Sequence, residues 1–307
     1  MREIFLKKSI IFSFIFLLIS LSGGILVFFA TQWGPWAFSD SAAYLNCAKN
    51  LNTGLGVTLA SENGKLYPFS IFPPFYAFVL SRFSLLTNDY ILAARILDAL
   101  CFGLLIFLIS WGTQSLSHNI YFSIFSGLFV LCAPIMLENN TGLMSEPLFF
   151  PLMYGSYFSM LFYLKDHKKI WLVLSFILTI LASLTRYIGV FLCLLNPLLL
   201  LFYDQPTWKE RIKKGVLFGF FSLLPVMLWL ITRKTDSKEI GGRYFFIPAD
   251  LKQRILIFSR DTVTVLQKWI PYMGYRINLI PDSLKLGLVV AFSMFLFVVD
   301  FILYIKR

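Results

Sequence analysis

The sequence predicts an all-α, polytopic membrane protein with about eight transmembrane helices, and three observations lead to this fold class. Hydrophobic residues make up 58% of the 307 residues and charged residues only 14%, whereas about a quarter of a soluble domain is charged. Apolar runs of about 20 residues recur, which is the length that crosses a bilayer as a helix. Basic residues stand at the ends of these runs, where they orient a membrane protein.

Eight segments are predicted to span the membrane. Their bounds are Ile10 to Ala30, Ala93 to Gly112, Ile120 to Leu137, Pro147 to Leu164, Ile170 to Thr185, Tyr187 to Tyr203, Gly215 to Thr232 and Leu286 to Ile305. The first is too long for the apolar region of a signal peptide and lacks a good cleavage site, so we expect it to remain as a helix. The fifth and sixth are short and nearly continuous, with a turn at "LTRYIG" between them.

The basic residues of the short loops predict the orientation of these spans. They form four clusters: Arg2, Lys7 and Lys8; Lys165, Lys168 and Lys169; Lys209, Arg211, Lys213 and Lys214; and Lys306 and Arg307. With eight spans all four clusters lie on one side, which the positive-inside rule identifies as the cytoplasm. Both termini are therefore predicted to be cytoplasmic, and two long loops, residues 31–92 and 233–285, to lie on the outer face. Orientation and anionic lipid account for the net charge of +11 better than nucleic-acid binding does.

The first outer loop is predicted to hold two short helices that lie at the membrane surface. In "SDSAAYLNCAKNLNTGLG", Ser39 or Asp40 is suited to cap a helix. One side of that helix is apolar at i, i+3, i+4 and i+7, with Tyr44, Cys47, Ala48 and Leu51. The other side holds Asn46, Lys49 and Asn50. A second helix follows at "FPPFYAFVLSRFSLL"; Pro73 and Pro74 suit its first turn, and it is too short to cross the membrane.

Three charged residues on the predicted outer face are candidates for chemistry. Asp40 is either an acid at a helix N-terminus or a general base or metal ligand. Glu146, in "MSEPLFFPLM", is either a first-turn acid or part of a site at the mouth of the fourth span. Arg186 lies between two apolar runs and is either a snorkelling side chain or a bidentate clamp for a phosphate.

Other charged and metal-binding residues are interpreted more simply. Arg95 and Asp98 are spaced i, i+3 near the outer end of the second span and are predicted to pair with each other. The second outer loop has an excess of basic residues, and Arg243 in its "GGRYFFIP" stretch is predicted to contact a phosphate. The four cysteines show no metal-binding spacing and no disulfide framework.

The order of these elements resembles the GT-C superfamily of membrane glycosyltransferases. The resemblance is to the branch around protein O-mannosyltransferases, lipid A aminoarabinose transferases and bacterial enzymes with an RgtA/B/C/D-like domain. The stretches that carry it are "SDSAAYLNCAKNLNTGLG", "FPPFYAFVL", "AARILDALCFGL", "MSEPLFF" and "LTRYIG", and the match extends to about Pro248. The "DE" pair of the mannosyltransferases is absent, because Ser41 follows Asp40.

The resemblance implies a fold, a reaction and a set of site residues. It implies one GT-C-like transmembrane domain over residues 1–307 and an inverting hexosyl- or pentosyltransferase. The donor would be a polyprenyl-phosphate sugar, and the acceptor a lipid, glycan or protein at the outer face of the cell membrane. It implies that Asp40 and Glu146 serve catalysis and that Arg186 and Arg243 bind the donor phosphate. Contacts with the substrate are predicted for Tyr44, Pro73, Pro74 and Tyr76.

The sequence leaves several alternatives open. Some relatives of this kind bind a divalent cation and others do not, so the metal is unknown and no other cofactor is expected. Members often continue beyond the point where this chain stops at "ILYIKR", so it is expected to be a short member, a truncated product or half of a split gene. A flippase or transporter for lipid-linked sugars and a non-catalytic scaffold are the competing functions. A transporter is expected to carry ionisable residues near mid-membrane, whereas the candidates here gather at one face.

Overall fold

The computed structural model describes residues 2–204, 207–232 and 253. The chain divides into two units, Met1–Leu131 with Leu137–Tyr244 and Cys132–Met136 with Phe245–Arg307. The site and the groove described below belong to the first unit. Arg243, the predicted eighth span and almost all of the second predicted outer loop lie outside the described residues.

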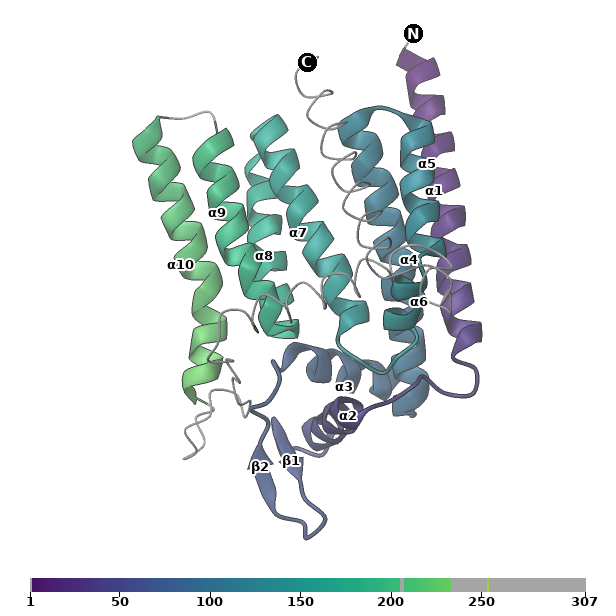
Figure 1. The fold of residues 1–307 in the computed structure, drawn as a ribbon, viewed down its shortest axis with the longest axis vertical. Helices are drawn as coiled ribbons and strands as arrows, with labels where there is room; N and C mark the ends of the chain where they lie inside the picture. The colour runs from purple at the N-terminus through teal and green to yellow at the C-terminus, as the bar shows by residue number, and fades with distance from the viewer. Residues whose placement is uncertain (1, 205–206, 233–252, 254–307) are drawn as a thin grey trace. The chain divides into compact units, whose positions relative to one another are not determined.

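The described residues are mostly helical (Figure 1). The elements are α1 (Arg2–Ala30), α2 (Ser39–Asn52), β1 (Thr58–Ala60), β2 (Leu66–Pro68), α3 (Phe75–Thr87), α4 (Tyr90–Ser117), α5 (Ile120–Cys132), α6 (Pro134–Asn140), α7 (Glu146–Asp166), α8 (Lys169–Thr185), the 3₁₀ helix η1 (Tyr187–Phe191), α9 (Leu192–Tyr203) and α10 (Trp208–Thr232). In Figure 1, α2, α3 and the two strands lie together at one end of the upright helices of the first unit, which is called the α2–α3 end below.

The membrane class is confirmed, whereas the number of eight spans stays a prediction. Within the described residues, α1, α4 and α10 are long and apolar enough to cross a membrane, and α5 with α6 would make a fourth such span. Helices α3, α8 and η1–α9 are apolar but shorter. The predicted third span is not a straight helix, because α5 and α6 meet at a bend of 59°. Pro134 explains the break, since it has no backbone N–H to donate to the preceding turn.

Helices α1 and α4 approach each other closely through small residues. The Ser20 hydroxyl donates to the Gly103 carbonyl over 2.5 Å. A Cβ atom on Gly24 would lie 2.9 Å from the Ala99 carbonyl oxygen, which is backbone and cannot move aside. Small residues at a helix interface let the backbones pack tightly, which is how membrane helices associate without a hydrophobic driving force.

The predicted ion pair between Arg95 and Asp98 is wrong. Arg95 turns to the end of α1 instead: it donates to the Phe28 carbonyl over 3.1 Å and to Thr31 Oγ1 over 3.4 Å. Its guanidinium carbon also lies 4.6 Å from the centroid of the Phe28 ring. The last carbonyls of a helix lack intrahelical donors, so they compete successfully for the arginine. Asp98 is fully buried, and neither carboxyl oxygen has a hydrogen-bond partner among the described residues.

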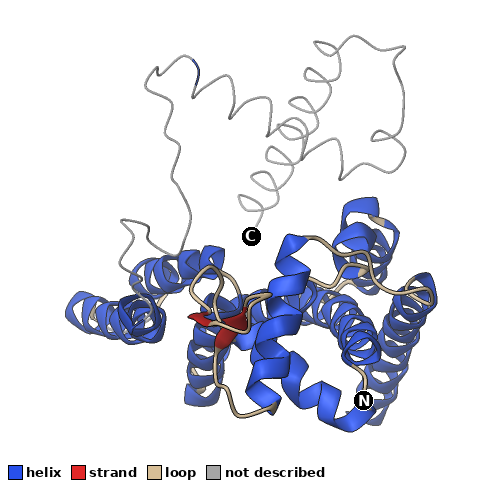
Figure 2. Ribbon diagram, turned by 90° about the horizontal axis from the view of Figure 1, so that it is seen from below, coloured by secondary structure: helices blue, strands red, loops and turns tan. Residues whose placement is uncertain are grey.

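Helices α2 and α3 pack on the ends of the upright helices instead of lying loosely beside them. Seen from this end, they cross in front of the bundle, with the strands at their side (Figure 2). One buried cluster joins α2, α3, the start of α4 and the start of α7, and its members include Tyr44, Cys47, Leu80, Leu97 and Leu148. The two predicted surface helices are therefore confirmed as helices. Pro74 is the N-cap of α3, and the helix begins at Phe75. The two prolines therefore precede the helix, whereas the sequence predicted them in its first turn.

The β1–β2 hairpin was not predicted, and it changes the interpretation of α2. Asn50 was predicted to face away from the apolar side, yet it is buried and donates to the Thr58 carbonyl over 3.0 Å. Asn46 donates to the Ala60 carbonyl and accepts from the Ala60 N–H, each over 2.9 Å. The asparagines of α2 thus satisfy the open edge of β1, and the polar side of the helix is covered by the hairpin.

The close approach of α1 and α4 gives a first prediction. Replacing Gly24 by Val places side-chain atoms against the Ala99 backbone, and overpacking of this kind costs about 1–3 kcal/mol. We expect the thermal unfolding midpoint of the detergent-solubilised Gly24→Val protein to fall by several degrees. Leu26→Val, at an exposed position of the same helix, is the matched control. Equal midpoints for the two variants would contradict this account of the α1–α4 interface.

Candidate active site

A contact between two loops brings the starts of α2 and α7 together. The Trp36 N–H donates to the Thr141 carbonyl over 3.2 Å, and the Leu143 N–H donates to the Trp36 carbonyl over 3.0 Å. The Trp36 indole N–H also donates to the Glu138 carbonyl over 2.9 Å. A Cβ atom on Gly142 would lie 2.4 Å from the Trp36 ring, so only glycine leaves room for it. The loop before α2 is therefore fixed to the loop before α7.

Asp40 lies in the first turn of α2 but does not cap it. The N-cap residue is Phe38, whose N–H donates to the Ser41 hydroxyl over 3.0 Å. The prediction that Ser39 or Asp40 caps the helix is therefore wrong, because Ser41 reaches back to the N-cap instead. Asp40 is half-buried, and its Oδ1 accepts a long hydrogen bond of 3.4 Å from the Ser39 hydroxyl. A carboxylate here interacts favourably with the positive end of the helix dipole.

Glu146 and Arg186 form an ion pair at the start of α7. The pair joins Arg186 Nη1 to Glu146 Oε1, and the two side chains are 32% and 18% exposed. Arg186 Nη1 also donates to the Ser145 hydroxyl over 3.2 Å. Glu146 Oε2 is buried without a hydrogen-bond partner among the described residues. Because both described contacts of the guanidinium use Nη1, the remaining donors of its planar fork are directed elsewhere.

Tyr44 connects these charged groups. Its hydroxyl donates to Ser145 Oγ over 3.1 Å, which ties the middle of α2 to the start of α7. Burial raises the pKa of Tyr44 to about 12; the Ser145 hydrogen bond and the Arg186 charge lower it, and the charges of Glu146 and Asp40 raise it. Tyr44 is therefore neutral at physiological pH. All three charges are therefore close enough to this hydroxyl to affect its ionisation.

The turn between α8 and η1 positions Arg186. Arg186 has an extended backbone between the two helices, and the Gly189 N–H closes the turn by donating to the Arg186 carbonyl over 2.8 Å. A Cβ atom on Gly189 would lie 2.7 Å from the backbone of Ala182, so glycine lets the chain fold back directly onto α8. The next residue, Tyr187, donates to the Ser70 carbonyl over 3.2 Å. The "LTRYIG" turn predicted from the sequence is thus confirmed as a tight turn, with Arg186 beside α7.

The predicted substrate-contacting residues are buried or half-buried. Tyr44 and Tyr76 are 2% and 0% exposed, and their rings meet edge to face with centroids 4.9 Å apart. Burial raises the pKa of Tyr76, and the nearby Asp98 carboxyl adds to the effect. Pro73 is buried and Pro74 half-buried. A direct contact of any of these side chains with substrate stays a prediction.

The arrangement combines charges of both signs with two helix N-termini. Helix N-termini offer backbone N–H groups and a positive dipole end, and Arg186 adds a full charge, so an anion is favoured nearby. Asp40 and Glu146 are carboxylates that can accept a proton. The described residues contain no group of three or more His, Cys, Asp or Glu side chains that could hold a metal ion.

Sequence reasoning missed the residues that assemble the site. It identified Asp40, Glu146 and Arg186 from their charge, but it did not identify Trp36, Gly142 or the N-cap Ser145. A partial signal existed, because Gly142 and Ser145 both stand in the short turn "ENNTGLMSE" before Glu146. Nothing in the sequence tells that Trp36, about 100 positions earlier, packs on that turn.

Comparisons with known proteins agree with this fold. The sequence model of the family described as dolichyl-phosphate-mannose-protein mannosyltransferase matches residues 72–229. The crystal structure of ArnT from Cupriavidus metallidurans bound to undecaprenyl phosphate is similar over 91% of this chain, with a TM-score of 0.57 and 17% sequence identity. The similarity covers 54% of ArnT, so the chain spans about half the length of that protein. No curated protein matches the sequence. Together these findings confirm the resemblance to the GT-C superfamily.

The Trp36 contact gives a second prediction. Trp36→Ala removes the ring that fills the space over Gly142, so the loops before α2 and α7 should separate more often. We expect amide hydrogen exchange to become about tenfold faster in peptides that cover residues 36–44 and 141–148. Trp33→Ala is the matched control, because Trp33 is 93% exposed in the same loop. Unchanged exchange in the 141–148 peptide would show that Trp36 does not hold the two loops together.

Proposed function

The chain belongs to the dolichyl-phosphate-mannose-protein mannosyltransferase family, and on this basis we propose that it is a membrane glycosyltransferase that uses a polyprenyl-phosphate-linked sugar donor. The acceptor is a lipid, a glycan or a protein, and the reaction inverts the anomeric centre. The observation that carries the proposal is the gathering of Asp40, Glu146 and Arg186 around Tyr44 at the starts of α2 and α7. A sugar transfer from a phosphate needs both a proton acceptor and a cation, and this centre supplies both.

Asp40 is the proposed general base. The acceptor hydroxyl or amine attacks the anomeric carbon, and its proton passes to the Asp40 carboxylate as the new bond forms. At the same time the bond between the anomeric carbon and the phosphate oxygen breaks, and the bonding electrons leave with the lipid phosphate. Asp40 suits this role because it is half-buried and, unlike Glu146, it has no ion pair among the described residues.

Arg186 is the proposed contact for the phosphate that leaves. Negative charge grows on this phosphate in the transition state, and a guanidinium stabilises it through paired hydrogen bonds. Glu146 holds Arg186 in place through their ion pair, so its contribution to catalysis runs through the arginine. The basic second outer loop with Arg243 is proposed to add further positive charge to the donor site.

The proposed location is the cell membrane, with both termini in the cytoplasm and the site at the outer face. Two observations support it. Long apolar helices are present, and the clusters around Lys168 and Lys213 lie at the ends of the helices opposite to the α2–α3 end (Figure 1). Lipid extraction of the purified protein followed by mass spectrometry tests the donor class. A co-purified polyprenyl phosphate, or its sugar ester, supports the proposal and also identifies the sugar for transfer assays.

The base assignment gives a third prediction. Asp40→Asn should lower the transfer rate by about 10²–10⁴-fold, the usual contribution of a general base, while binding of the lipid donor is kept. Sugar transfer and donor binding are measured on the same purified protein. Asp89→Asn is the matched control: Asp89 caps α4 by accepting from the Ile91 and Leu92 N–H groups, and asparagine caps equally well. An Asp40→Asn protein with near wild-type transfer would disprove the role of Asp40.

The phosphate assignment gives a fourth prediction. Arg186→Lys keeps the charge beside Glu146 but loses the planar fork, so the dissociation constant of the donor should rise about tenfold or more. Thermal stability should change little. Arg82→Lys, at an exposed position of α3, is the control and should leave donor affinity unchanged. If Arg186→Lys binds the donor as tightly as wild type, the phosphate contact belongs elsewhere, with the second outer loop as the next candidate.

A further inference from the structure

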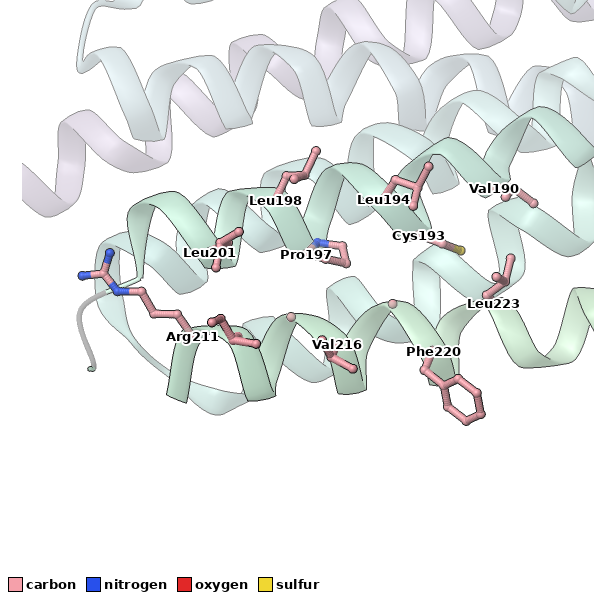
Figure 3. Close-up of a pocket in the computed structure, with 13 residues that line it drawn as sticks. Val190, Cys193, Leu194, Pro197, Leu198, Leu201, Arg211, Val216, Phe220 and Leu223 are labelled. Carbon is pink, nitrogen blue, oxygen red and sulfur yellow. The ribbon is translucent and has the colours of Figure 1, made fainter. Parts of the chain in front are cut away.

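A long apolar groove lies between α9 and α10, and none of the site residues Asp40, Glu146 and Arg186 lines it. Its volume is about 660 Å³, within the range of sites that bind small molecules. Figure 3 shows Val190 and Leu223 at one end, Leu194, Pro197 and Leu198 along α9, and Arg211 at the other end. Arg211 is the charged residue that lines it, and Arg186 does not.

The groove exists because α10 presents glycines to a proline of α9. Gly215 and Gly219 line the groove, and Cβ atoms there would lie 3.3 Å from the Pro197 carbonyl oxygen and 3.1 Å from the Cys193 carbonyl oxygen. Helix backbones therefore form its floor, and larger side chains such as Leu198 and Val216 form its walls (Figure 3). A slot of this shape suits a slender, flexible hydrocarbon chain.

The dimensions and charge of the groove match one class of occupant. From Val190 to Leu201 a helix rises about 16 Å, close to half of the roughly 30 Å hydrocarbon core and so to the depth of one leaflet. The Arg211 end carries the cluster "WKERIKK", in which the cations Lys209, Arg211, Lys213 and Lys214 outnumber the single acid Glu210. Exposed Trp208 and Tyr203 lie at this end as well, as aromatic side chains do at the headgroup level.

We propose that this groove binds an anionic glycerophospholipid from the leaflet on the basic side of the protein, with its phosphate at Arg211 and one acyl chain along α9 and α10. Arginine contacts a phosphate through a planar fork of donors, and the neighbouring lysines attract anionic lipid to the same level. The polyprenyl tail of the sugar donor is a less suitable occupant, because with its phosphate at Arg186 it would bring only hydrocarbon to the Arg211 end of the groove. This site does not depend on the proposed transferase activity.

Native mass spectrometry of the full-length, delipidated protein tests the proposal. The probes are phosphatidylglycerol and phosphatidylcholine with the same acyl chains, each titrated in detergent, and undecaprenyl phosphate as a competitor. Wild type should bind phosphatidylglycerol about fivefold more tightly than phosphatidylcholine, the preference expected from roughly one cation near a phosphate. Arg211→Gln should abolish that preference, while Lys213→Gln, which removes an exposed cation outside the groove, should keep most of it.

Paired tryptophan substitutions test the groove itself. Val216→Trp fills the groove and should weaken phosphatidylglycerol binding about tenfold, as expected when about two methylene groups lose their contacts. Leu217→Trp adds the same side chain at the next exposed position of α10, outside the groove, and should leave binding unchanged. Equal effects of the two tryptophans, or no preference for phosphatidylglycerol, would overturn the proposal. Displacement of phosphatidylglycerol by one equivalent of undecaprenyl phosphate, in wild type and Arg211→Gln alike, would assign the groove to the polyprenyl chain instead.

Discussion

The arrangement at the α2–α3 end depends on the packing of Trp36 against Gly142. This contact joins two loops that are about 100 residues apart in sequence, and it leaves the first turns of α2 and α7 side by side. Each of these turns carries an acid, Asp40 in one and Glu146 in the other. Each acid interacts favourably with the positive end of its own helix dipole, and the loop contact brings the two helix N-termini together. The third group, Arg186, comes from the turn between α8 and η1 and offsets one of the two negative charges.

The ion pair between Arg186 and Glu146 explains how a partly buried cation is stabilised at the start of α7. Both side chains are largely buried, and a cation buried alone would be costly. Glu146 offsets that cost, and the Ser145 hydroxyl, held by Tyr44, adds a second contact. A pair in such a place adds little net stability, because desolvation cancels much of the attraction. Its effect is on orientation: the Nη1 contacts with Glu146 and Ser145 fix the guanidinium at the start of α7. The sequence left Glu146 as either a first-turn acid or part of a site, and the structure pairs it with Arg186.

The sequence predicts the parts of this structure that depend on composition and spacing along a single helix. It places Asp40, Glu146 and Arg186 at one face, because span counting and charge suffice for that. The sequence prediction fails where a partner that is distant along the chain determines a side chain's contacts. Arg95 leaves its neighbour Asp98 for the carbonyls at the end of α1, and Asn50 is buried because a hairpin covers it. Pro134 was visible in the sequence, but its effect was underestimated, since an apolar run of adequate length looked like one straight span. These outcomes were set by competition between backbone and side-chain partners, which a local pattern does not reveal.

Hydrogen bonds between the helices α7 to α10 help to fix the position of Arg186 relative to Glu146. Near mid-bundle, Asn196 of α9 donates to Ser156 of α7 over 3.0 Å and to Thr179 of α8 over 2.9 Å, and all three residues are buried. Toward the basic end, Lys214 of α10 bonds to Asp204 and to Tyr163 of α7, each over 3.0 Å. Hydrogen bonds between membrane helices contribute about 0.6–2 kcal/mol each, and they also fix register, which apolar packing alone defines less sharply. Because Arg186 lies in the turn between α8 and α9, this register determines its height relative to the start of α7. The precision of the charged centre is therefore set partly by uncharged residues deep in the bundle.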